Sequence, residues 1–286
     1  MKLKTWKLKT LLVALFFFAA AAAYAQQNNF TIQRDHEDIG VENYTFDKTK
    51  NGFKVDSNYH YSVAPRPDTV GLRLGNATST HTGPGSSTVT NAPDTEDMQL
   101  KHTYTLDAGY AYASGELANL KTELSMTYGL NKERTQLTQN RQHPGKPTIS
   151  TQFPFQSGGL FLPPFDASPI QALVYMATTH PTVNGQYYLA APAPAFAIES
   201  GAIQWNTLAD ATGTLDGKPV TVHRYGFLFG IHEYTVYTDA ENTLMEVDIH
   251  HPTQSLIRTG FVLDPQKSSH GAHTGNADMQ TTAAPN

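Results

Sequence analysis

Residues 44–63 read YTFDKTKNGFKVDSNYHYSV, and this stretch decides the fold class. Apolar residues occupy alternate positions on both sides of the Asn51-Gly52 pair, with Asp, Lys, Asn and Ser between many of them. A period of two is typical of a strand with one buried face. An Asn-Gly pair is a strong signal for a tight hairpin turn, because both residues tolerate positive φ. The stretch therefore predicts two antiparallel strands joined by a short turn.

The same pattern recurs toward the C-terminal end of the chain. After an Asp216-Gly217 turn, apolar residues alternate from position 220 to 231, and a second alternating run follows at 244–249. Weaker strand patterns occur at 30–34, 99–106, 117–128, 133–138, 148–153, 202–211 and 256–262. Strands that are neighbours in sequence usually pair with each other. We therefore expect a mainly β protein with one large curved antiparallel sheet, a half-barrel, of about ten strands.

One segment has helical rather than strand spacing. Apolar residues three and four positions apart follow Ser168-Pro169, and His180-Pro181 ends the run. Serine as the N-cap and proline at the first helical position are typical of a helix start. The run is apolar on nearly every side, which is typical of a buried helix. The pattern predicts one α-helix near residues 168–179 that covers the sheet.

The first 25 residues have the features of an export signal. Four lysines precede an unbroken apolar run at 11–23, and Ala23-Tyr24-Ala25 offers a signal peptidase site before Gln26. As a helix this run is about 20 Å long, which is short for a ~30 Å hydrocarbon core, although a membrane anchor is the alternative. We expect a signal helix cleaved between Ala25 and Gln26. The product would then reach the periplasm or the extracellular space without stable membrane insertion.

The rest of the chain is expected to form a single β-rich domain at 26–266. It includes a flexible loop at 64–95, rich in Pro, Gly, Ser, Thr and Asn, and a disordered polar tail follows at 267–286. The chain has no cysteine, which excludes disulfides and thiol chemistry. Four of the 20 basic residues lie in the signal segment, so 16 remain against 25 acidic residues. That balance opposes binding to nucleic acid.

Candidate catalytic and metal-binding residues form no recognisable motif. His250-His251 are neighbours on an expected strand, so they point to opposite faces, and His232-Glu233 lacks a second histidine four residues on. The acidic segment 35–38 is explained more simply as a β-turn than as a general base. No Gly-x-Ser-x-Gly segment occurs. We therefore expect no catalytic residues, no metal and no cofactor.

The aromatic residues indicate a different kind of function. Fourteen Tyr and fourteen Phe are present, and they gather on the alternating strands, where burial of one sheet face explains them most simply. A curved sheet with an aromatic concave face under one apolar helix also forms a cavity for an apolar ligand. In this hypothesis the lining residues are Tyr44, Phe46, Tyr59, Tyr61, Phe227 and Phe229, and the covering residues are Leu173, Val174 and Met176.

This organisation resembles the periplasmic lipoprotein carriers and their exported half-barrel relatives. The resemblance rests on the hairpin at 42–63, the strand at 99–106, the interrupting segment at 161–179 and the closing run at 220–261. In that family a hydrophobic cavity between sheet and helices holds lipid tails. The resemblance implies an exported, non-enzymatic protein that binds a lipid-like molecule or a cell-envelope partner.

Two other classes remain open. Parts of the middle and closing segments look like a β domain that elsewhere precedes a catalytic domain, which would make the chain a secreted hydrolase or an accessory domain of one. The alternation also suits an outer-membrane β-barrel. Bacterial barrels usually end in an aromatic strand, whereas this sequence ends in Ala283-Ala284-Pro285-Asn286.

Overall fold

The computed structural model describes residues 27–63, 96–192, 198–250 and 253–265. The expected signal helix with its Ala25–Gln26 cleavage site, the loop at 64–95 and the tail at 267–286 lie outside the described residues. Within the described part, the chain is mainly β and contains one α-helix, as the sequence predicts.

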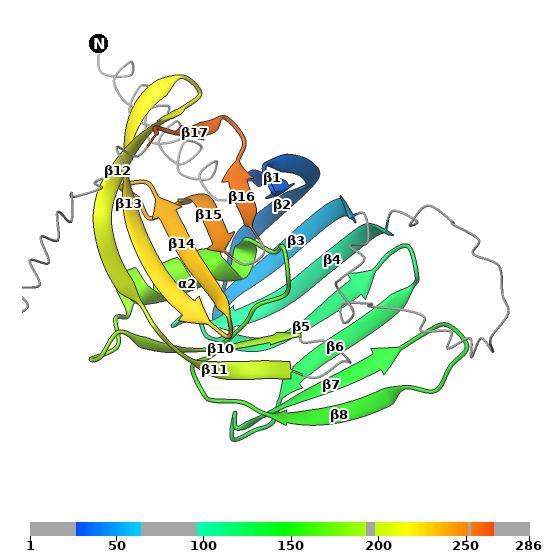
Figure 1. Ribbon diagram of the computed structural model, residues 1–286. Coiled ribbons are helices and arrows are strands. Elements are labelled where there is room, and N and C mark those ends of the chain that lie inside the picture. The colour runs from blue at the N-terminus through cyan, green and yellow to red at the C-terminus, as the bar shows by residue number, and fades with distance from the viewer. Residues whose placement is uncertain (1–26, 64–95, 193–197, 251–252, 266–286) are drawn as a thin grey trace, which may run out of the picture.

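Most strands belong to one large sheet in which every neighbouring pair is antiparallel (Figure 1). Its order is β17-β12-β13-β14-β15-β16-β1-β2-β3-β4-β5-β6-β7-β8, and it is not closed, because β17 and β8 are its two edges. In chain order these strands are β1 (Asn28–Arg34), β2 (Glu37–Thr49), β3 (Gly52–Val63), β4 (Glu96–Asp107), β5 (Tyr112–Asn119), β6 (Leu124–Leu130), β7 (Gln136–Gln142), β8 (Ile149–Pro154), β12 (Asn206–Leu215), β13 (Lys218–Phe229), β14 (His232–Thr238), β15 (Leu244–His250), β16 (Gln254–Arg258) and β17 (Phe261–Leu263).

The strand β1 joins the two halves of the large sheet, because it pairs with β16 on one side and β2 on the other. The β2–β3 hairpin turns at Lys50-Asn51, one residue before the predicted Asn51-Gly52 pair, because Gly52 already pairs with Thr49 as the first residue of β3, and the β12–β13 hairpin turns at Asp216-Gly217. Both predicted hairpins therefore lie in the same sheet. The expectation of one large, mostly sequential antiparallel sheet is confirmed.

The expected number of about ten strands is wrong. The described residues contain seventeen strands, of which fourteen form the large sheet. The expected strand at 117–128, for example, contains the β5–β6 turn. No Gly or Pro marks this turn; instead, the Asn119 side-chain oxygen accepts the backbone N–H groups of Lys121 at 3.0 Å and Thr122 at 3.1 Å. A turn held by a side chain lacks the composition on which the prediction depended.

A second, smaller sheet is another difference between the structure and the sequence prediction. It contains β9 (Leu160–Phe161), β10 (Gln186–Pro192) and β11 (Ile198–Gln204), in the order β11-β10-β9. The expected strand at 202–211 is split at Trp205, the one residue between β11 and β12. The Trp205 ring stacks on Tyr225 of β13 at 4.8 Å. This contact fixes the point at which the chain passes from the small sheet to the large one.

The helix α2 (Ser168–Thr179) lies in the concavity of the large sheet, and its bounds agree with the prediction (Figure 1). Most of its surface is buried; Leu173 and Val174 have no exposed area. The predicted N-cap is wrong, because Ala167 occupies that position. The Asp166 side chain accepts the Ser168 N–H at 3.0 Å and so satisfies one of the free donors of the first turn.

One hydrophobic cluster fills the space between the inner face of the sheet and α2. Residues on alternate positions of each strand contribute to it, so the opposite positions form the outer face. A second, smaller cluster belongs to that outer face and contains Ala211, Val222, Tyr237, Met245 and Phe261.

Candidate functional site

The residues predicted to line and cover a ligand site come together in the large core cluster. Eight of the nine are buried, and the ninth, Phe46, is partly buried and packs against them. The eight buried residues are Tyr44, Tyr59, Tyr61, Leu173, Val174, Met176, Phe227 and Phe229. They fill the concave face by packing on one another, and their binding of a ligand stays a prediction.

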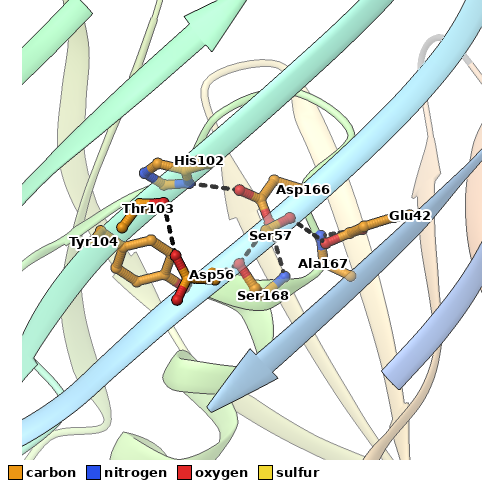
Figure 2. Close-up of polar contacts among 9 residues, drawn as sticks. All are labelled: Glu42, Asp56, Ser57, His102, Thr103, Tyr104, Asp166, Ala167 and Ser168. Carbon is orange, nitrogen blue, oxygen red and sulfur yellow. Dashed lines mark hydrogen bonds and ion pairs between the residues drawn. The ribbon is translucent and has the colours of Figure 1, made fainter. Parts of the chain in front are cut away.

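A buried polar cluster lies inside this aromatic core, at the N-terminal end of α2 (Figure 2). Glu42 of β2, Ser57 of β3 and His102 of β4 point inward from neighbouring strands, and Asp166 meets them from the segment before the helix. All four are at most 1% exposed. Burying polar groups is unfavourable unless they are paired, so their hydrogen bonds define what the cluster does.

Asp166 is the charged centre of the cluster. Its Oδ2 lies 2.6 Å from His102 Nδ1, and its Oδ1 accepts the hydroxyl of Ser168 at 2.6 Å. Tyr104 in turn donates to the Ser168 hydroxyl at 3.0 Å. Burial alone would raise the pKa of Asp166, but the hydrogen bond to His102 and the electrostatic interaction with its ring, together with the Ser168 bond, lower that pKa below the usual range.

Glu42 is the second carboxyl group of the cluster. Burial first, and then repulsion from Asp166, raise the pKa of Glu42 well above its ordinary value. Glu42 is hydrogen-bonded to Asp166, and its oxygens accept from the Ser57 hydroxyl at 3.1 Å and the Ala167 N–H at 2.8 Å. The pKa values of the two carboxyl groups are thus moved apart, as is typical of carboxyl groups that share a buried site.

The cluster has the groups of a general base but not the arrangement of a hydrolase site. An Asp-oriented histidine can activate a serine only when the hydroxyl reaches its other ring nitrogen. Here the Ser168 hydroxyl contacts Asp166, and among the described residues nothing bonds to His102 Nε2. These contacts fix the start of α2 to the strands β2 and β4, and Ser57 of β3 supports Glu42 from the strand between them.

Sequence reasoning missed this polar cluster. Ser57 and His102 occupy inward positions on strands whose other inward residues are largely aromatic or apolar. A polar residue at an inward position is the signal that could have found it. Nothing in the sequence shows that Asp166, more than 60 residues beyond His102, supplies the partner.

The other end of α2 borders a cavity of about 300 Å³. Its walls come from the β2–β3 hairpin, the β4–β5 turn and the last residues of the helix. The lining residues are Lys48, Thr49, Lys50, Gly52, Phe53, Ala108, Tyr110, Thr179 and His180. None of the nine predicted ligand-site residues is among them.

Two stacked rings, Phe53 and Tyr110, form part of the cavity wall, with centroids 4.6 Å apart and planes at 14°. Tyr110 has a positive φ of 66°, an unfavourable backbone conformation for a large side chain. The Asp107 carboxylate holds the turn in this shape by accepting the N–H groups of Gly109 at 2.9 Å and Ala111 at 3.0 Å. The aromatic wall is therefore preformed.

A continuous row of ring contacts leads from this cavity into the core. Tyr110 lies 5.3 Å from Tyr175, and Tyr175 lies 5.8 Å from Phe46. Phe46 contacts Tyr44 at 5.7 Å, and Tyr44 stacks on Phe30 at 5.6 Å. The row connects the cavity to the concave face under the helix.

The other residues that the sequence analysis considered for catalysis or metal binding lie outside the polar cluster and the cavity. Asp35 and His36 form the turn between β1 and β2, as expected of a β-turn. His232 begins β14 and His250 ends β15, whereas His251 lies outside the described residues. No three His, Asp or Glu side chains in the described ranges are grouped so that they could hold a metal ion.

In the described residues, an open antiparallel sheet holds one helix in its concavity. The buried polar cluster lies at the start of this helix, and the cavity lies at its end. No helix in the part of the chain that the structure describes is long and apolar enough to cross a membrane. A scan against protein-family models finds no match, and a search of the curated proteins finds none either.

Proposed function

We propose that the protein is an exported, non-enzymatic binding protein that holds an apolar or lipid-like ligand against the concave face of its sheet. The observation that carries this proposal is the row of aromatic rings from the cavity at the end of α2 to the core. The cavity volume, about 300 Å³, is at the lower end of the range for small-molecule sites. A longer apolar chain would continue along the ring row past Tyr175.

The two ends of α2 differ in how they are held, which supports entry at the cavity end. Near its start, Gln171 accepts the Leu244 N–H at 2.7 Å and donates to the Asn242 carbonyl at 2.8 Å. Near its end, the hydroxyls of Thr178 and Thr179 bond only to carbonyls of the helix itself. The last turn can therefore move to admit a ligand while the first turns stay docked.

Apolar burial would supply the affinity. Each methylene group removed from water contributes about 0.8 kcal/mol. The aromatic rings of Phe46 and Tyr175 give such a chain flat surfaces, and both are only partly buried, so they can change position more readily than the fully buried rings. Non-directional contacts of this kind bind a class of apolar chains rather than one molecule.

Titration of the delipidated protein with a fluorescent fatty acid tests the proposal. We expect saturable binding and a higher melting temperature, since a ligand at 100 times its Kd stabilises the folded state by about 2.7 kcal/mol. Tyr175→Trp should weaken binding by filling the row, and Tyr175→Phe should leave it unchanged. Absence of saturable binding, with no change in melting temperature, would refute the proposal.

A further inference from the structure

We infer that the ligand carries an anionic head, a carboxylate or phosphate, and that Lys48 and Lys50 at the mouth of the cavity bind it. This inference rests on the proposed function and names the chemical class of its ligand. It predicts an amphiphile whose charged head stays at the hairpin while its tail follows the ring row.

The two lysines are close together and unneutralised. Lys48 lies near the end of β2 opposite Phe53, and Lys50 lies in the hairpin turn, so both line the same cavity. Neither forms an ion pair with any described residue. By contrast, Lys54 on the next strand is paired with Asp56 at 2.6 Å.

Two acidic residues beside the cavity do not compete for these lysines. Asp107, in the turn beside the cavity, already bonds Arg134 at 3.0 Å and two backbone N–H groups. Asp47 neighbours Lys48 on β2, and alternation places its side chain on the opposite face of the sheet. An incoming anion therefore meets positive charge that no carboxylate at the mouth has satisfied.

Recognition depends on the side chains and not on the helix. The C-terminal end of α2 carries a partial negative charge that disfavours an anion. Two ammonium groups, with the His180 ring near Tyr110 as a further polar group, outweigh it at the mouth. The chain as a whole has a formal net charge of −5, so this local positive charge is a feature of the site and not of the general surface.

Competition assays with matched ligands separate this inference from the proposed function. Palmitate and hexadecanol share one alkyl chain and differ in the head group. The full-length mature protein should bind palmitate about tenfold more tightly than hexadecanol, and added salt should reduce the difference. Inorganic phosphate and acetate, tested alone, show whether the head suffices without a tail.

The variant Lys48→Gln/Lys50→Gln should lose the preference for palmitate and keep its affinity for hexadecanol. Lys54→Gln is the matched control, because its charge is already paired on the outer face, and it should change neither affinity. Equal binding of both ligands to the unsubstituted protein, or no effect of the double substitution, would overturn the inference and leave the proposed function intact. Binding of neither ligand would refute both. If inorganic phosphate alone bound as tightly as palmitate, the inference of an amphiphilic ligand would be overturned and the cavity would be a site for free anions.

Discussion

The carboxyl groups of Glu42 and Asp166 are hydrogen-bonded to each other beneath the first turn of α2, and their surroundings shift their pKa values in opposite directions, upward for Glu42 and downward for Asp166. One comes from β2 and the other from the segment before the helix, 124 positions further along the chain. Their contact fixes the start of the helix to the sheet. The two residues are equally buried, but their pKa values are shifted in opposite directions, and this difference predicts unequal effects of substitution.

Asp166→Asn should destabilise the protein by roughly 1–3 kcal/mol, because it disturbs the 2.6 Å hydrogen bonds to His102 and Ser168 in a fully buried site. Glu42→Gln should destabilise it less, since the raised pKa of Glu42 favours its neutral form, and glutamine retains a donor and an acceptor. Urea unfolding at pH 7 measures both values. Equal losses for the two variants would contradict the opposite pKa shifts of the pair.

A second buried carboxyl predicts how stability depends on pH. Burial, and then the neighbouring Asp248, raise the pKa of Glu246 to about 8. This value is above the unfolded-state pKa of about 4.3, so the folded state binds the proton more tightly. The stabilising contribution is complete below pH about 4.3 and is lost as the pH rises through 8. Over that window, the contribution of this group falls by about 1.4 kcal/mol per pH unit.

Glu246→Gln should remove the part of the pH dependence of the free energy of unfolding that comes from this carboxyl group. The variant therefore gains stability relative to the unsubstituted protein as the pH rises from 5 to 8. Urea unfolding of both proteins at several pH values measures this difference in stability. Glu42 contributes a slope of the same sign to both proteins, so its contribution cancels in the difference. Glu233→Gln, the same substitution at an exposed position of β14, is the control for the exchange itself. Parallel curves for Glu246→Gln and the unsubstituted protein would show that the group is ionised in the folded state.

The hydroxyls of the buried tyrosines are not equivalent. Tyr112 and Tyr59 have buried hydroxyl oxygens that bond to no described residue, whereas Tyr104 donates to Ser168 at 3.0 Å. An unpaired buried hydroxyl is unfavourable, so Tyr112→Phe should leave stability unchanged or raise it by about 1 kcal/mol. Tyr104→Phe should lower it by about 1 kcal/mol. Denaturant midpoints of the two variants compare them, and a marked loss for Tyr112→Phe would reveal a hydrogen bond at its hydroxyl.

Local patterns predicted the parts of this fold that local chemistry determines. Asp216-Gly217 specifies its turn because both residues have positive φ, Gly52 marks the end of the Lys50-Asn51 turn, and the apolar spacing after Ser168 specifies the helix. The turn after Asn119 was missed because it depends on side-chain hydrogen bonds that no composition rule marks. The contact of Glu42 with Asp166 was missed because only the three-dimensional fold brings β2 and the helix start together.

The uneven attachment of α2 predicts an uneven pattern of hydrogen exchange. The amides near Gln171 belong to a turn whose side chain bonds to the β14–β15 turn and β15, so they should exchange slowly. The amides of Ala177–His180 should exchange faster, because the polar side chains of that turn bond only within the helix. Palmitate should slow the second group and leave the first unchanged, since the ligand contacts the cavity end. Mass-spectrometric exchange with and without palmitate measures both, and equal protection along the whole helix would show that the ligand does not enter at this end.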